Sequence, residues 1–132
     1  MSGFSTNLAQ KVINHFFRNV SQTATAATYL ALFVADPTDD NVTANEVSAA
    51  WYGRQQVTSW AAPVGTGATT SNSNQIVYSA VTDAAVTVTH WAIYDAATSG
   101  NLLGSGALTS TKVLNVDDVF VANAGELVLD FV

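Results

Sequence analysis

The sequence predicts a mainly β domain, an antiparallel β-sandwich or barrel, that carries one α-helix at its N-terminus. A helical period of apolar residues is confined to about the first 20 residues, and beyond residue 27 the apolar residues alternate with a period of two. Turn-forming residues separate these alternating segments at intervals typical of antiparallel sheets. Since the 132 residues show no repeat and no linker, we expect a single domain over 1–132, with the helix at about 6–20 and the β-rich body at about 28–132.

The helix is indicated by a cap and by one broad apolar face. Ser5 or Thr6 can accept a hydrogen bond from the first free backbone N–H groups. The apolar face is formed by residues three and four apart, namely Leu8, Val12, Ile13, Phe16, Phe17 and Val20. Lys11, Asn14 and Arg18 fall on the opposite side. One helix cannot bury such a face alone, so we expect it to pack on the sheet.

The strands follow from apolar runs bounded by turn residues. Residues 28–35 are apolar on both faces, which indicates a central buried strand, and the Asp- and Pro-containing residues 36–41 end it. The clearest strand is 86–95, with Val86, Val88, His90, Ala92 and Tyr94 on one face and Thr87, Thr89, Trp91 and Ile93 on the other. The polar residues 61–74 predict a solvent loop or a hairpin arm. Shorter strands are expected at 54–60, 75–78, 102–108, 112–116, 119–121 and 126–132, where Leu127, Leu129 and Phe131 alternate with polar positions.

The charge balance argues against several classes of partner. Only four residues are basic, Lys11, Arg18, Arg54 and Lys112, and the formal net charge is −6. Nucleic acids and anionic membranes require clustered cations, so we expect neither as a partner. The 27 Ser and Thr residues instead give a hydroxyl-rich surface that costs little to desolvate, as suits a chain packed against other subunits; an ordinary β-rich domain with few charges is the alternative. With no signal peptide at the start, we expect synthesis in the cytoplasm.

The residues that most often carry chemistry do not form a recognisable site. His15 and His90 have no Cys, Asp or Glu at metal-ligand spacing, so we assign both a structural role. Asp36, Asp39 and Asp40 do not match the spacing of a calcium loop, and an Asx-type turn is the simpler interpretation; a cation site there stays open. We therefore predict no catalytic residue, no cofactor and no metal, and a protein that is not an enzyme.

The aromatic residues supply candidates for a protein interface. Trp91 alternates with buried neighbours and is assigned to the core. Trp51 and Tyr52 lie between strands, where they can anchor an interface, although a core position and a sugar-stacking platform are alternatives. Arg54 would supply a directional charged contact. The interface candidates, from the helix Leu8–Asn19, the segment 51–54 and the loop 63–74, are Lys11, Arg18, Trp51, Tyr52, Arg54, Trp60 and Pro63.

Several blocks of sequence resemble one known family. They are Leu8-Ala9-x-x-Val12-x-Asn14-His15-x-x-Arg18-Asn19, Tyr29-Leu30-Ala31-Leu32-Phe33 with Asp36-Pro37-Thr38-Asp39, Glu46-Val47-Ser48 with Tyr52-x-Arg54-Gln55, Val88-Thr89-His90-Trp91-Ala92-Ile93-Tyr94-Asp95-Ala96, Gly100-Asn101-Leu102-Leu103-x-x-Gly106-Ala107-Leu108 and Ala124-Gly125-Glu126-Leu127. Together they resemble a family of small virion structural proteins of tailed bacteriophages, often described as tail fibre proteins and similar to head decoration (cement) proteins. The chain departs from the family where relatives often have glycines and it has Ala49, Ala50 and Trp51.

The resemblance implies a structural role in the virion and no catalytic residues. We expect a non-enzymatic capsid decoration (cement) protein, a homotrimer or other homo-oligomer that binds the outside of the major capsid protein lattice and stabilises the head. The alternative is a tail fibre, baseplate or tail adaptor subunit whose partners are tail proteins. A glycan-binding module that uses Trp51 or Trp60 is a further alternative, and a hydrolase is the last.

Overall fold

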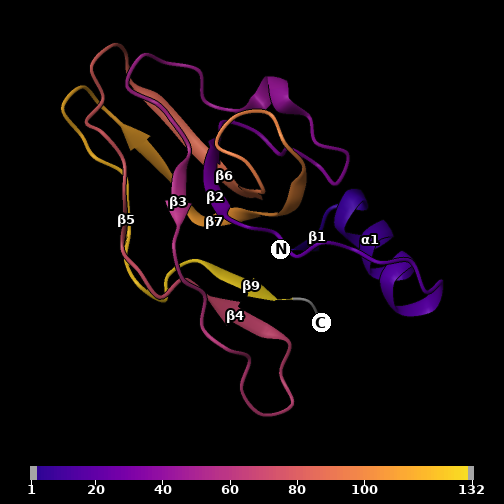
Figure 1. Cartoon of the computed structure of the whole chain (residues 1–132). Coiled ribbons are helices and arrows are strands. Elements are labelled where there is room, and N and C mark those ends of the chain that lie inside the picture. The colour runs from indigo at the N-terminus through magenta and orange to yellow at the C-terminus, as the bar shows by residue number, and fades with distance from the viewer. Residues whose placement is uncertain (1–2, 131–132) are drawn as a thin grey trace.

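The computed structural model describes residues 3–130 and confirms a mainly β, antiparallel fold with one α-helix near the N-terminus (Figure 1). In chain order the elements are β1 (Gly3–Phe4), α1 (Thr6–Phe17), β2 (Thr28–Phe33), the single-turn helix η1 (Thr43–Asn45), β3 (Gln55–Val57), β4 (Thr69–Ser71), β5 (Ile76–Val77), β6 (Val86–Tyr94), β7 (Leu102–Leu114), β8 (Val121–Ala122) and β9 (Val128–Asp130). Within this range, five strands form one sheet in the order β1-β7-β6-β2-β3, while β4 pairs with β9 and β5 pairs with β8.

The centre of the fold is the sheet around β2. Its last four residues are buried, as the doubly apolar pattern predicts. Leu30 and Leu32 face the larger core cluster, and Ala31 and Phe33 face a smaller one. The larger cluster is completed by side chains from the segments around β5, β8 and β9, among them Ile76, Tyr78, Phe120, Ala122, Leu127 and Leu129. The two small sheets thus cover one face of the large sheet, which gives the layered packing of a sandwich.

The segments 102–108 and 112–116, predicted as separate strands, are largely one strand, β7. The predicted break reflects a real irregularity in its pairing with β6. Val88 pairs with Lys112 and His90 pairs with Ala107, so residues 108–111 bulge opposite Thr89. A bulge interrupts the ladder without ending the strand, which the sequence pattern alone does not distinguish from a turn.

The predicted alternation of β6 side chains between two faces is also interrupted at this bulge. Ala92 and Tyr94 share the smaller cluster, as expected, but Val88 joins Trp91 and Ile93 in the larger one. Strict alternation holds only where the ladder is regular. Trp91 is a core residue, as predicted.

The helix α1 begins as predicted, but only its N-terminal part contacts the sheet, at β7. The Ser5 hydroxyl accepts a hydrogen bond from the Leu8 N–H at 3.0 Å and donates to the carbonyl of Leu102, so the cap is tied to β7. α1 ends at Phe17 rather than at residue 20, and none of its residues is buried. Leu8 and Val12 are half-buried, but Phe16 and Phe17 are 73% and 80% exposed, so the predicted burial was wrong for the C-terminal half of the apolar face. The reason is geometric, because only the first turn is anchored and the rest projects beyond the sheet edge (Figure 1).

The polar residues 61–74 form a hairpin arm, one of the two predicted forms. Within it β4 pairs with β9, and Trp60 forms a bridge with Asn72. Asn72 is buried and joins the arm to the C-terminal segment, since its amide donates to the carbonyls of Asn74 and Asn123 and its side-chain oxygen accepts from the Leu127 N–H. Strand β9 begins at Val128 rather than at residue 126, and Phe131 lies outside the described residues.

The remaining strands are shorter than their predictions. The segments 54–60, 75–78 and 119–121 contribute β3, β5 and β8, which span three, two and two residues. Over residues 3–130, no helix combines the length and apolar character that a membrane crossing requires.

Candidate protein interface

The structure divides the predicted interface residues among three locations. Lys11 and Arg18 are on α1, Trp60 and Pro63 are at the base of the arm and on it, and Trp51, Tyr52 and Arg54 lie against the core. The three locations differ in how much of each side chain a partner could reach.

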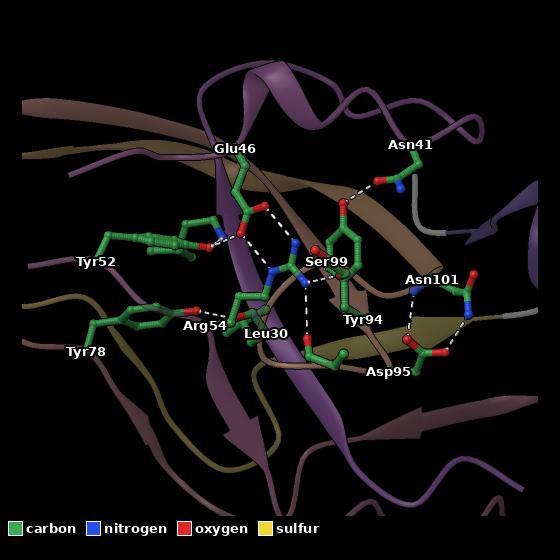
Figure 2. Close-up of polar contacts among 12 residues, drawn as sticks. Leu30, Asn41, Glu46, Tyr52, Arg54, Tyr78, Tyr94, Asp95, Ser99 and Asn101 are labelled. Carbon is green, nitrogen blue, oxygen red and sulfur yellow. Dashed lines mark hydrogen bonds and ion pairs between the residues drawn. The ribbon is translucent and has the colours of Figure 1, made fainter. Parts of the chain in front are cut away.

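Arg54 is held by contacts inside the protein (Figure 2). Its Nε and Nη2 donate to the two carboxylate oxygens of Glu46, both at 2.8 Å. Its Nη1 donates to the carbonyls of Ala96 at 3.1 Å and Ser99 at 2.7 Å. The guanidinium carbon lies 3.6 Å from the centroid of the Tyr94 ring, within the range of a cation–π contact. Since its side chain is only 5% exposed, Arg54 links the segment before β3 to the β6–β7 turn and offers little to a partner.

Tyrosines surround this ion pair. The Tyr52 hydroxyl donates to Glu46 at 2.7 Å and accepts from the Leu32 N–H at 3.2 Å (Figure 2). The Tyr94 hydroxyl donates to the side chain of Asn41. We refer to Glu46, Tyr52, Arg54 and Tyr94 as the Arg54 cluster.

Burial and charge set the ionisation of the cluster. Burial, helped by the hydrogen bond to Glu46 and its negative charge, raises the pKa of Tyr52. Burial raises the pKa of Tyr94 to about 12, although the charge of Arg54 acts against it. Burial alone would lower the pKa of Arg54, but its hydrogen bonds and ion pair with Glu46 outweigh burial and raise it. The tyrosines therefore stay neutral and Arg54 stays charged at neutral pH.

Trp51 belongs to the core. It is 8% exposed, lies in the larger cluster and has its ring 6.0 Å from that of Tyr52. Its indole N–H is buried without a hydrogen-bond partner. A stacking platform needs an open ring face, so the structure favours the core alternative for Trp51.

Trp60 and Pro63 differ in exposure. Trp60 is half-buried at the edge of the larger cluster, and its indole N–H donates to the Thr28 hydroxyl at 2.9 Å. Pro63 is exposed on the arm beside Val64. The arm therefore offers a small surface to a partner.

The acidic turn has a structural role, as the Asx-turn interpretation predicts. Asp36 accepts from the Thr38 N–H at 2.8 Å, and Asp40 accepts from the Thr6 hydroxyl at 3.2 Å, which helps to hold the start of α1. In the part of the chain that the structure describes, no group of three or more His, Cys, Asp or Glu side chains could hold a metal ion.

The two histidines lie on different elements. The ring of His15 meets that of Phe16 edge-on at 4.8 Å on the exposed end of α1. A ring nitrogen of His90, on β6, is 2.8 Å from the hydroxyl of Thr89.

The largest side chains offered to a partner are on α1. We call the exposed apolar residues Ile13, Phe16 and Phe17 of α1, together with Val20 just beyond its end, the α1 patch. Arg18 is exposed beside the patch, and its guanidinium donates to the Asn14 side chain at 2.7 Å. The sequence signal for this surface is the apolar stripe of the helix; the helix was an expected source of interface residues, but through Lys11 and Arg18, whereas its apolar stripe was expected to pack on the sheet.

The comparison with known families supports the resemblance in the sequence. The chain matches, over residues 3–130, the family described as podophage GP4 fiber I protein gp80. No curated protein matches it. The match spans nearly the whole chain and includes every element described above, together with the segments quoted for the resemblance. The chain belongs to the podophage GP4 fiber I protein gp80 family, a family of phage virion structural proteins with a fibre-like role.

Proposed function

We propose that this protein is a non-enzymatic subunit of a virion tail fibre, whose task is to hold other protein subunits in place. The observation that carries the proposal is the α1 patch, where two phenylalanines project from a well-packed body. Exposed apolar clusters of this kind mark protein contacts, with aromatic side chains as their usual anchors. The fibre role agrees with the description of the family.

The polar groups of the Arg54 cluster support a structural rather than a catalytic role. Glu46 is paired with Arg54 through two hydrogen bonds and also accepts from Tyr52, so its carboxylate is not available as a general base. The cluster also fixes the segment before β3 to the β6–β7 turn, so α1 projects from a firmly packed body.

Capsid decoration is the second candidate. It is favoured by the hydroxyl-rich composition, since most of the 27 Ser and Thr residues lie outside the core, and a surface rich in hydroxyls with few ions costs little to cover with a capsid lattice. In that case the partner would be the major capsid protein, whereas a fibre subunit would bind tail proteins.

The copy number and position of the protein in purified virions test both candidates. We expect quantitative mass spectrometry against the major capsid protein to give a low number set by tail symmetry, with antibody label at the tail. Hundreds of copies with label over the head would overturn the fibre proposal in favour of decoration. Absence from purified virions would overturn both.

A further inference from the structure

An open cavity of about 480 Å³ lies between the second half of β7 and the segment around β8. Its floor is made of core side chains, among them Leu30, Trp91 and Phe120. Its rim includes residues 108–110, which belong to the bulge of β7. Bulges are frequent next to functional sites, where they redirect side chains. Small-molecule sites combine an apolar lining with a few polar groups in a volume of roughly 300–1,000 Å³, and this cavity fits that description.

Two side chains of opposite charge line the cavity without pairing. Lys112 on β7 and Glu126 in the turn before β9 are both exposed there. Hydrogen bonds from Asn123 lower the pKa of Glu126, and the charge of Lys112 acts in the same direction. In the described part of the chain, however, Lys112 and Glu126 form no ion pair with each other. The Asn123 N–H donates to the Glu126 carboxylate at 2.8 Å, so an unpaired ammonium and a positioned carboxylate share one opening.

Trp91 contributes an unused donor to the same cavity. The indole N–H of Trp60 donates to Thr28, and that of Trp51 is buried without a partner. The Trp91 N–H has no hydrogen-bond partner within residues 3–130, yet it is not closed off from solvent, although Trp91 is only 7% exposed. Since the ring is otherwise packed in the larger core cluster, the cavity is where this donor meets solvent. A bound molecule with an acceptor at this point would satisfy it.

We propose that the cavity binds a neutral polyhydroxyl compound, with one pyranose ring of a carbohydrate as the unit recognised. One cation and one anion line the cavity, so a ligand gains nothing there from a net charge. A hydroxyl group both donates and accepts, so neighbouring ring hydroxyls can accept from Lys112 and donate to Glu126. The Trp91 N–H donates to a further ring oxygen, and the C–H face of the ring packs on the apolar floor beside Phe120.

The proposal goes beyond the proposed function, because it adds a small-molecule site to a subunit that holds other proteins. It also differs from a sugar-stacking platform at Trp51 or Trp60, since the ligand is held by hydrogen-bonding groups around an apolar floor. A zwitterion such as free leucine would place its carboxylate at Lys112 and its ammonium at Glu126. Both of these charges are exposed, so water and salt screen such ion pairs, which favours the neutral ligand.

Nuclear magnetic resonance titration of the isotope-labelled, full-length protein tests the proposal. The probes are glucose, galactose, mannose and rhamnose, each added separately, with leucine as the zwitterionic probe. Each of the three tryptophans gives one indole N–H resonance, which serves as a local reporter. With at least one of the sugars we expect the Trp91 resonance to shift along a saturable curve. The resonances of Trp51 and Trp60, which do not line the cavity, should stay in place.

Substitutions at the rim test which side chains hold the ligand. K112Q and E126Q each remove one charged hydrogen-bonding group and should weaken sugar binding roughly fivefold, the effect of one lost hydrogen bond. K11Q and D39N are the matched controls, because both residues lie outside the cavity, and the affinity should stay unchanged. T109F places a large ring at the rim and should abolish the saturable shift.

Three results would overturn the proposal: no saturable shift of Trp91 with any of the four sugars, binding of leucine without binding of a sugar, or unchanged affinity in both K112Q and E126Q. The methyl glycoside of a bound sugar distinguishes the source of the ligand. Equal affinity for the glycoside indicates a unit linked within a longer carbohydrate, and lost affinity indicates a free sugar; both support the polyhydroxyl class. The copy number in virions is measured separately, so failure here leaves the proposed function standing.

Discussion

Arg54 shows how a residue can suit a partner by its chemistry and yet be used inside the fold. Its guanidinium contacts Glu46, eight residues away, and the carbonyl of Ser99, 45 residues away. Neither partner is at a local spacing, so the sequence pattern identifies Arg54 as a residue of interest without identifying what it binds. The same holds for Trp51. Its residue type suggests an interface anchor, but the fold buries it in the core.

Replacing Arg54 with alanine should strongly destabilise the protein. It leaves the Glu46 carboxylate and two carbonyls without their donor in a largely buried site, which costs on the order of 3–5 kcal/mol. R54K should not restore stability, since an ammonium cannot form the two parallel bonds to Glu46. Urea unfolding measures the change, with R18A as the control, because Arg18 is exposed and its loss should stay within about 0.5 kcal/mol. Equal stability of R54A and R18A would contradict the role of the cluster.

The raised pKa values of the tyrosines in the Arg54 cluster lead us to expect a loss of stability at alkaline pH. Folding raises the pKa of Tyr94 from 10.0 to about 12, so its contribution is complete below pH 10 and is lost as the pH rises from 10 to about 12. The absorbance of ionised tyrosine, followed together with the unfolding free energy, should show both changes in this window. Y94F should lose less stability across it than the unmodified protein. An identical loss in Y94F would exclude Tyr94 as a source.

At the scale of the elements, the β6–β7 turn depends on side chains as well as on backbone. Asp95 accepts from the N–H of Asn101 at 2.7 Å and from its side-chain amide at 2.9 Å (Figure 2). Burial disfavours the charged carboxylate, but these hydrogen bonds outweigh it and lower the pKa of Asp95. With its shape fixed in this way, the β6–β7 turn places the Ser99 carbonyl where it accepts a hydrogen bond from Arg54.

Gly100 is the residue of this turn that tolerates substitution least. Its φ is +76°, and an added Cβ would lie 2.6 Å from the Asp95 carboxylate and 2.7 Å from the Ala96 Cβ. G100A should therefore cost roughly 1–3 kcal/mol in thermal or urea unfolding. Gly53 offers a matched control, because nothing lies within 4 Å of its added Cβ; G53A should be neutral or slightly stabilising. A G100A protein as stable as G53A would show that the turn can relax.

Periodicity predicted the elements better than it predicted their contacts. The helix and the strands β2 and β6 could be predicted from local patterns, since burial on one or both faces imposes them. The pairing of β4 with β9 could not, because three polar residues on an arm carry no apolar alternation. The exposure of the C-terminal half of α1 could not be predicted either, because a stripe of apolar residues has the same pattern whether its own sheet or a partner protein covers it.

At the scale of the whole molecule, the charge is unevenly distributed along the chain. The formal net charge of −6 combines a cationic N-terminal segment with an acidic body. Net charge keeps copies apart in solution, while local complementarity of sign favours particular contacts.

Solubility should therefore have a minimum near pH 4.3, the isoelectric point of the sequence. As the carboxylates of the body become protonated, the repulsion between copies vanishes and light scattering should rise. F16S/F17S should show a smaller rise at the same pH, because it lacks the largest exposed apolar side chains. A protein that remains equally soluble through this pH would show that charge does not keep its copies apart.

The edges of the large sheet have a consequence for how densely copies can be crowded. Among residues 3–130, its two outermost strands, β1 and β3, span two and three residues. β1 covers β7 at Gly104 and Ser105, and the rest of that strand carries the bulge at 108–111 and the charge of Lys112. Short, bulged and charged edges are poor templates for adding a foreign strand. Copies held close together are thus kept from joining strand to strand through the described edges of this sheet.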